Sequence, residues 1–112
     1  PMMGVAVADP ATPVLKQNNG LVVLSAQKAT LPAPQPCIRC GRCIDACPMG
    51  LEPVVIAEAF NNKDLTALKA RCIDLCVACG SCSYVCPAKR PVSQTMALAK
   101  AWYLSEARKG GK

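Results

Sequence analysis

The first apolar stretch of the chain is a short unbroken run. Leu21-Val22-Val23-Leu24 follows Asn18-Asn19-Gly20, a combination of residues that favours a tight turn. A run of this length after a turn is typical of a strand, so residues 21–25 are expected to form one. Proline is frequent elsewhere in residues 1–36, most of all in residues 31–36, and it disfavours helix there. We therefore expect an irregular lead-in with one short strand, belonging to an upstream domain.

Two later stretches have the periodicity of helices. Pro53 is well placed as the first residue of a helix that continues through apolar residues and ends at Asn61-Asn62. Asp64 can cap a second helix, in which apolar residues recur at helical spacing from Leu65 to Cys72. The segment between residues 49 and 75 is therefore predicted to be helical.

A third helix is expected near the end of the chain. Ser93 can cap it, and the pattern continues to about Lys109, where Gly110-Gly111 stops it. Its apolar face is expected to contain Leu98, Ala101, Trp102 and Leu104-Ser105, with the aromatic rings in core packing rather than in an electron relay. The predicted domain boundaries are residues 1–36 for the lead-in, 37–109 for the main domain and 110–112 for a disordered tail.

Cysteine and histidine usage narrows the possible chemistry. Nine of the 112 residues are cysteine and none is histidine. Such a density indicates disulfides, zinc or iron–sulfur clusters, whereas the lack of histidine excludes Cys/His zinc sites, Rieske clusters and histidine acid–base catalysis. No stretch approaches the roughly 20 apolar residues that cross a bilayer, and no signal peptide is evident. Because the chain begins with Pro1 rather than Met, we expect a fragment of a longer protein.

Eight of the cysteines form an internal repeat. Each run has the spacing C-x2-C-x2-C-x3-C-P, with glycine after the second cysteine, and a single offset superimposes one run on the other. Three closely spaced thiolates on a winding loop can reach three corners of a cubane cluster, while the inward backbone amides stabilise its negative charge. The runs are Cys37, Cys40, Cys43 and Cys47, then Cys76, Cys79, Cys82 and Cys86. They predict two [4Fe–4S] clusters.

The cluster that the fourth cysteine of each run binds is known in a related class of proteins. In bacterial two-cluster ferredoxins it binds the cluster of the other run. Carried onto this chain, cluster I takes Cys37, Cys40, Cys43 and Cys86, and cluster II takes Cys76, Cys79, Cys82 and Cys47. No residue is expected to be catalytic.

Two alternatives concern the cysteines. Zinc sites remain an alternative reading of the runs, although zinc knuckles separate their C-x2-C pairs by longer loops. The ninth cysteine, Cys72, is either a redox thiol or a small buried apolar residue on a helix face with Leu65 and Leu68. We favour the buried residue.

The basic balance of the chain is offset by the expected cofactors. The formal charge is +6, but each oxidised cluster with four thiolates contributes about −2, which leaves a mildly basic protein. Arg39, Arg42, Lys89 and Arg90 lie beside the cysteines. They either raise the cluster potential and dock an acidic electron donor, or form a solvated surface. The residues alone leave both readings open.

Several segments together resemble a known family. The chain is similar to the C-terminal ferredoxin-like region of the C subunit of the Rnf electron-transport complex, called Rsx in some bacteria. The resemblance rests on the opening Pro1-Met2-Met3-Gly4, on residues 37–43, on Ala46-Cys47-Pro48-Met49-Gly50-Leu51 with Pro53, and on residues 76–91. It is weakest in residues 54–72 and after Met96.

This resemblance implies a fold and a setting. The implied fold is mainly α, a helical ferredoxin-type domain with two [4Fe–4S] clusters, here preceded by the irregular lead-in with its short strand. The implied complex couples electron flow between ferredoxin and NAD⁺ to ion movement, and its C subunit is peripheral on the cytoplasmic side of the inner membrane. FMN and NADH are expected only in a domain upstream of this chain. Partners would be other subunits and ferredoxin-type proteins.

The expected function is therefore electron transfer through two clusters within such a membrane complex, and the chain by itself is an electron carrier. Two other functions stay open. One is the iron–sulfur region of another oxidoreductase, such as a cobalamin-reductase-like protein or a dehydrogenase subunit. The other is a zinc-binding or nucleic-acid-binding module, which the basic charge alone would favour. No binding of nucleic acid is expected from the cluster reading.

Overall fold

The computed structural model describes residues 6–30 and 32–110. The chain divides into two compact units, one reaching Ala33 and the other starting at Pro34. The opening Pro1-Met2-Met3-Gly4 and the end of the tail, Gly111-Lys112, lie outside the described residues.

The first unit has little regular structure. Its one helix among the described residues is α1, Ala26–Ala29, and a turn at Leu15–Asn18 closes through a bond from the Asn18 amide to the Leu15 carbonyl, 3.0 Å long. The strand predicted at residues 21–25 is wrong: no strand forms there, and no strand that could pair with it occurs among the described residues. Their side chains point into solvent instead, and Val23 is 93% exposed. An apolar run without a pairing partner gains nothing from extended geometry.

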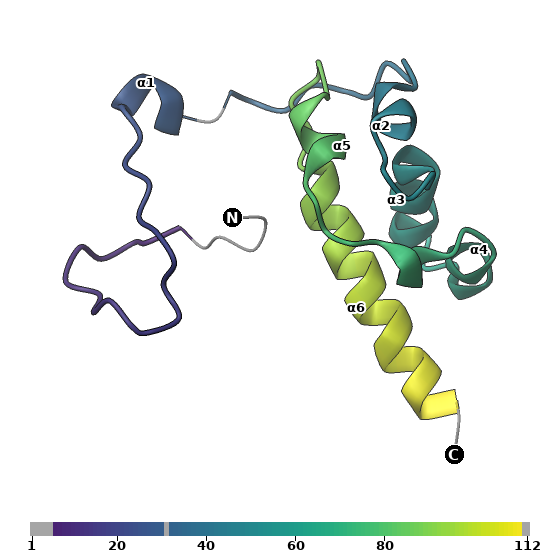
Figure 1. The fold of residues 1–112 in the computed structure, drawn as a ribbon. Coiled ribbons are helices and arrows are strands. Elements are labelled where there is room, and N and C mark those ends of the chain that lie inside the picture. The colour runs from purple at the N-terminus through teal and green to yellow at the C-terminus, as the bar shows by residue number, and fades with distance from the viewer. Residues whose placement is uncertain (1–5, 31, 111–112) are drawn as a thin grey trace. The chain divides into compact units, whose positions relative to one another are not determined.

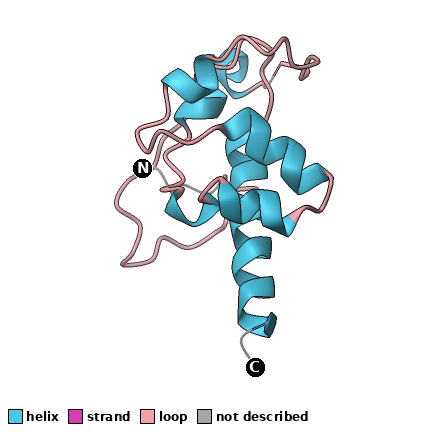
Figure 2. Cartoon of the chain, turned by 90° about the vertical axis from the view of Figure 1, so that its right-hand side faces the viewer, coloured by secondary structure: helices cyan, strands magenta, loops and turns pink. Residues whose placement is uncertain are grey.

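The second unit is built from helices. Figure 2 shows helices and loops and no strand among the described residues, which confirms the mainly α fold. In chain order the elements are α2 Arg42–Asp45, α3 Pro53–Asn61, α4 Leu65–Ala70, the 3-10 helix η1 Ile73–Leu75, α5 Ser81–Tyr84 and α6 Val92–Gly110.

Helices α3 and α4 follow their local sequence signals. Pro53 is the first residue of α3, where its missing N–H costs no hydrogen bond, and Asn62 ends the helix. Asp64 caps α4, and its carboxylate accepts a bond of 2.9 Å from the Ala67 amide. Both helix predictions are confirmed.

The start of α6 differs from the prediction. The helix begins at Val92, so Ser93 lies inside the helix rather than at the cap position. Instead the Ser83 hydroxyl accepts a 2.8 Å bond from the Ser93 amide, and the two hydroxyls lie 2.9 Å apart. A cap supplied from α5 leaves no signal in the sequence next to the helix. At the other end, Gly110 is the last residue of α6 rather than part of a disordered tail.

The core lies where α3 and α6 pack together, with α4 and η1 covering one end (Figure 1). Its buried residues are Leu51, Ile56, Ala59, Leu68, Ile73, Val92, Met96 and Ala99. The apolar face predicted for α6 is partly wrong: Leu98 is 60% exposed, while Met96 and Ala99 face the core. Trp102 and Tyr103 pack against that core, which confirms their packing role. The last turns of α6 project past the other helices (Figures 1 and 2).

Candidate metal centre

The backbone repeats in the two cysteine runs. Three positions with positive φ recur at matching places when Cys37 is aligned with Cys76. The pairs are Arg39 (52°) with Ala78 (54°), Gly41 (78°) with Gly80 (80°), and Gly50 (64°) with Lys89 (51°). Left-handed residues between helical or extended ones turn successive N–H groups toward one side of the loop and form an anion-binding concavity. Each run therefore carries the backbone that a negatively charged cluster requires.

A short helix follows each of the middle glycines. Gly41 is the N-cap of α2 and Gly80 is the N-cap of α5, so the third cysteine of each run, Cys43 or Cys82, is held on a helical turn. Glycine adopts this φ without the cost that a side chain imposes, whereas Arg39 and Ala78 do carry that cost. Non-glycine residues retained in this conformation beside a site are typical of functional loops.

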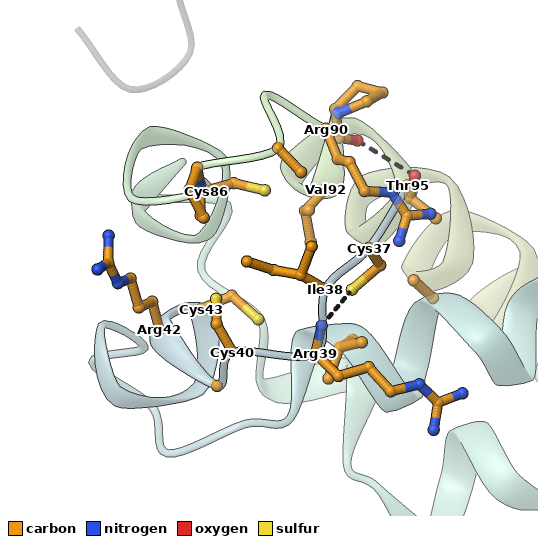
Figure 3. A pocket seen from close by; sticks show the side chains of 16 residues that line it. Cys37, Ile38, Arg39, Cys40, Arg42, Cys43, Cys86, Arg90, Val92 and Thr95 are labelled. Carbon is orange, nitrogen blue, oxygen red and sulfur yellow. Dashed lines mark hydrogen bonds between the residues drawn. The ribbon is translucent and has the colours of Figure 1, made fainter. Parts of the chain in front are cut away.

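One cavity gathers cysteines from both runs. Cys37, Cys40 and Cys43 line it together with Cys86, and its volume is about 80 Å³. In Figure 3, Cys86 from the second run stands over the same pocket as Cys40 and Cys43. Residues of α3 and α6, among them Val54 and Thr95, close the inner wall. We call this the first cavity.

A second cavity gathers the remaining four cysteines of the runs. Cys76, Cys79 and Cys82 line it with Cys47, and its volume is about 20 Å³. Cys47, Cys76 and Cys82 also pack against the hydrophobic core. The structure thus brings the eight cysteines together in two sets of four, and each set takes three members from one run and the last from the other.

Hydrogen bonds and charges distinguish the thiols. The Arg39 amide donates to Cys37 Sγ over 3.4 Å and lowers the pKa of that thiol, an effect to which the Arg90 guanidinium adds. The Ser81 hydroxyl, 3.4 Å from Cys79 Sγ, lowers the pKa of Cys79. The Leu51 amide likewise donates to Cys47 Sγ over 3.4 Å. Bonds of this kind stabilise negative sulfur.

The third cysteine of each run behaves in the opposite way. Burial raises the pKa of the Cys82 thiol to about 11, and the nearby Cys76 and Cys79 add to the rise. Burial also raises the pKa of the Cys43 thiol. Clustered thiols resist ionisation without a cation among them, so metal binding at either cavity must release protons.

The donor set fits an iron–sulfur cube. Thiolate is the ligand such clusters take, and each cavity offers four cysteines with backbone amides aimed at sulfur. Within residues 6–30 and 32–110, no three Cys, Asp or Glu side chains are arranged to hold a single metal ion. A cube spreads its four irons over separate corners, so its ligands stand farther apart than those of one ion.

Cys72 lies elsewhere, and the prediction that it is buried is wrong. Helix α4 ends at Ala70, so Cys72 falls outside it, with φ at 50° and an exposed side chain. Ile73 takes the buried position instead. Two more residues of helix would have brought Cys72, four residues after Leu68, onto the same face as Leu68.

The arginines beside the runs meet different partners. Arg39, Arg42 and Arg90 all line the first cavity, and Arg39 also pairs with Glu58 at 3.3 Å. The sequence already placed these arginines beside the cysteines, but the pairing of Arg39 with Glu58 could not be read from it, because Glu58 lies far from residue 39 along the chain. Over the residues that the structure covers, no helix has the length and apolar character needed to traverse a lipid bilayer.

Comparisons with known proteins agree with the cysteine pattern. Residues 36–90 match the family described as 4Fe-4S dicluster domain. The C subunit of the ion-translocating oxidoreductase complex of Rhodobacter capsulatus is 44% identical over 65 residues, which make up 58% of this chain and 12% of that protein.

Two further relatives carry related names. The C subunit of the Na(+)-translocating ferredoxin:NAD(+) oxidoreductase complex of Acetobacterium woodii is 41% identical over 58 residues, covering 52% of this chain and 13% of that protein. The C subunit of the ion-translocating oxidoreductase complex of Buchnera aphidicola is 29% identical over 93 residues, 82% of this chain and 20% of that protein. The chain therefore spans a fifth or less of the length of these relatives. Residues 36–90 of this chain thus match a 4Fe-4S dicluster domain and carry two [4Fe–4S] clusters, and the same region is similar to C subunits of ion-translocating oxidoreductase complexes of the Rnf type.

Proposed function

We propose that the chain passes single electrons between its two clusters as the iron–sulfur part of an Rnf-type ion-translocating oxidoreductase complex. One observation carries the proposal: each cavity is lined by four cysteines, drawn from both runs. Clusters bound there supply one-electron redox states. The chain holds the two sites on one compact unit, because α3 and α6 contribute walls to both.

The ligands follow from this arrangement. We assign Cys37, Cys40, Cys43 and Cys86 to cluster I, and Cys76, Cys79, Cys82 and Cys47 to cluster II. The backbone amides of Arg39 and Leu51 then stabilise thiolate at one ligand of each cluster. No side chain has to move a proton during electron transfer, so the chain acts as a carrier.

The wider setting rests on the relatives. The names of the relatives refer to ion-translocating complexes with several subunits, and the name of the Acetobacterium woodii relative refers to a ferredoxin:NAD(+) oxidoreductase. We infer that other subunits and ferredoxin-type proteins exchange electrons with this chain, at the cytoplasmic face of the membrane as a peripheral component. FMN and NADH would bind in the larger part of such a subunit, outside this chain.

The first test is the metal content of the whole chain, assembled anaerobically with iron and sulfide. We expect about eight irons per chain and, after reduction, an electron paramagnetic resonance spectrum of two interacting clusters. Cys72→Ser is the matched control and should keep all the iron, because this exposed thiol lines neither cavity. Colourless protein with stoichiometric zinc would reject the proposal.

The second test concerns which cysteines share a cluster. Cys40→Ala with Cys86→Ala removes two ligands from one cluster in our assignment, so this double variant should keep one complete cluster and about four irons. Cys40→Ala with Cys47→Ala removes one ligand from each and should leave no complete cluster. Ligation within each run predicts the reverse iron contents, so the pair of variants decides between the two arrangements.

A further inference from the structure

The two cavities differ in the charge around them. Arg39, Arg42 and Arg90 line the first cavity. The described residues that line the second include no Arg, Lys, Asp or Glu; apart from the cysteines and Ser93 they are apolar residues, proline and glycine. The internal repeat makes this difference unusually clear, because the backbone of the two runs is the same.

Each arginine has an uncharged counterpart in the other copy of the repeat. Alignment of the two copies places Ala78 at the position of Arg39, Ser81 at that of Arg42 and Leu51 at that of Arg90. Ala78 and Leu51 line the second cavity as Arg39 and Arg90 line the first. The chain thus contains its own comparison: matched loops, with three guanidinium groups at one and none at the other.

Arg90 is the arginine most closely tied to a ligand. Its side chain lines the first cavity together with Cys37, and Figure 3 shows the two side chains next to each other. Arg39 has a weaker claim, because it pairs with Glu58 and both side chains are largely exposed, at 75% and 56%. Water and salt screen a charge in that position.

The second cavity does have one cation behind it. Lys100 of α6 donates from Nζ to the Cys76 carbonyl over 2.8 Å. The ammonium group thus faces a backbone carbonyl oxygen, and Lys100 does not line the cavity. The second cavity therefore has one ammonium group behind it, whereas three guanidinium groups line the first.

Solvation acts in the same direction as charge. Cys37 and Cys40 are exposed, whereas the second set has three members packed against the core. Adding an electron makes a cluster more negative, which positive neighbours and water favour and apolar surroundings oppose. Both effects favour the reduced state at the first cavity.

We propose that the cluster of the first cavity has the higher reduction potential, so that a single electron delivered to the chain resides there, and that Arg90 is the main residue setting the difference. The step is the gain of one electron by one oxidised cluster, and the electron comes from a low-potential donor. The inference rests on the proposed function, since it requires both clusters and the ligand sets given above.

The test is an anaerobic redox titration of the full chain followed by electron paramagnetic resonance. Arg90→Gln should lower the higher of the two midpoint potentials and leave the lower one in place. Arg108→Gln is the matched control, since it removes the same charge from the last turn of α6, about 20 Å along the helix from Thr95. Arg39→Gln should give a smaller shift than Arg90→Gln.

The reciprocal change adds charge to the second cavity. Ala78→Arg places a guanidinium where the repeat has Arg39, at nearly the same φ, and should raise the lower potential and narrow the gap. Two single-cluster variants assign the potentials. The Cys40→Ala, Cys86→Ala variant should retain the lower potential, and a Cys47→Ala, Cys76→Ala variant should retain the higher one.

Failures of the two proposals are distinguishable. A chain that binds no iron removes the proposed function and this inference with it. A chain with both clusters but with the potentials reversed in the single-cluster variants removes only the inference. The inference alone also fails if Arg90→Gln shifts the lower potential, or shifts the higher one no more than Arg108→Gln does. If the Arg90→Gln variant does not bind its clusters, the Ala78→Arg variant and the single-cluster variants still test which cluster has the higher potential.

Discussion

The two cysteine runs share a backbone but not an environment. Both have the same ligand spacing and the same three left-handed positions, yet the first presents exposed Cys37 and Cys40, while Cys76 and Cys82 of the second contact the hydrophobic core. The cavities differ accordingly, at about 80 Å³ and about 20 Å³. Local sequence therefore sets how ligands are displayed, and helix packing sets what surrounds them.

This division has a physical origin in the helices between and after the runs. Leu51 and Met96 reach the second cavity from the core side, so that wall is built from buried residues. Thr95 is the neighbour of Met96 on α6, and it lines the first cavity instead. At these two neighbouring positions α6 presents a buried residue to the second cavity and a half-buried one to the first, although buried Val92 of the same helix also lines the first. Unfolding of the cluster-loaded chain in urea, kept anaerobic and followed by helical circular dichroism, measures that contrast.

The largest loss of stability is expected from a substitution in the wall of the second cavity. Met96 is only 2% exposed, so Met96→Ala removes a core side chain and should lower the free energy of unfolding by about 2–5 kcal/mol. Thr95→Ala, its matched control at the first cavity, should cost no more than about 0.5 kcal/mol. Equal losses would contradict the difference between the two walls.

The glycines test whether the two loops are as alike as their φ angles. Nothing lies within 4 Å of a Cβ added at Gly41 or Gly80, so alanine there meets only the cost of its left-handed backbone. Each substitution should lower the free energy of unfolding by about 1–2 kcal/mol, and by similar amounts. Gly20→Ala, where no positive φ arises, should cost almost nothing. A large inequality between Gly41→Ala and Gly80→Ala would show that the loops differ in strain.

Ser83 belongs to the second run alone, because Ile44 stands at the matching place in the first. Its hydroxyl accepts a hydrogen bond from the Ser93 amide at the start of α6. Ser83→Ala should therefore lower the free energy of unfolding by about 1 kcal/mol. Ser105→Ala removes a hydroxyl that bonds within the exposed part of α6 and should change little. A loss at Ser83 no greater than that at Ser105 would argue against a cap supplied from α5.

The smallest change in the free energy of unfolding is expected from a substitution at the surface beside the first run. The ion pair between Arg39 and Glu58 is largely exposed, so Glu58→Gln should lower the free energy of unfolding by less than about 1 kcal/mol. Repeating the urea titration at high salt checks the cause, because screening should remove most of that difference. A larger loss that persists in salt would mean that this pair supports the loop in another way.

The sequence predicted best where a signal is local. Pro53 and Asp64 mark the starts of α3 and α4 through groups that act within one turn of their own helix, and the structure places both helices there. The repeat of glycines and cysteines predicted the shared form of the runs for the same reason. The sharing of cysteines between runs stays a prediction until ligation is measured, although both cavities have the expected lining.

Predictions failed where a distant part of the fold decides the outcome. In the part of the chain that the structure describes, residues 21–25 find no strand to pair with, and Cys72 falls outside α4 because the helix ends at Ala70. Helix α6 is rich in apolar residues on several sides, so periodicity alone could not choose between Leu98 and Met96. Packing against α3 makes that choice, and α3 lies far from α6 along the chain.

The lining of the first cavity bears on how the protein is made. Cys37, Cys40 and Cys43 emerge early during synthesis, but Cys86 follows only after the whole helical linker. A nascent chain that has reached Cys47 presents three thiols of the first set and one of the second, and completes neither. Neither set of four is complete until Cys82 has been made, which completes the second set, and the first set must wait for Cys86. A chain truncated before residue 82 would therefore lack a full set of four cysteines at either cavity, and one truncated between residues 82 and 86 would have only the second set.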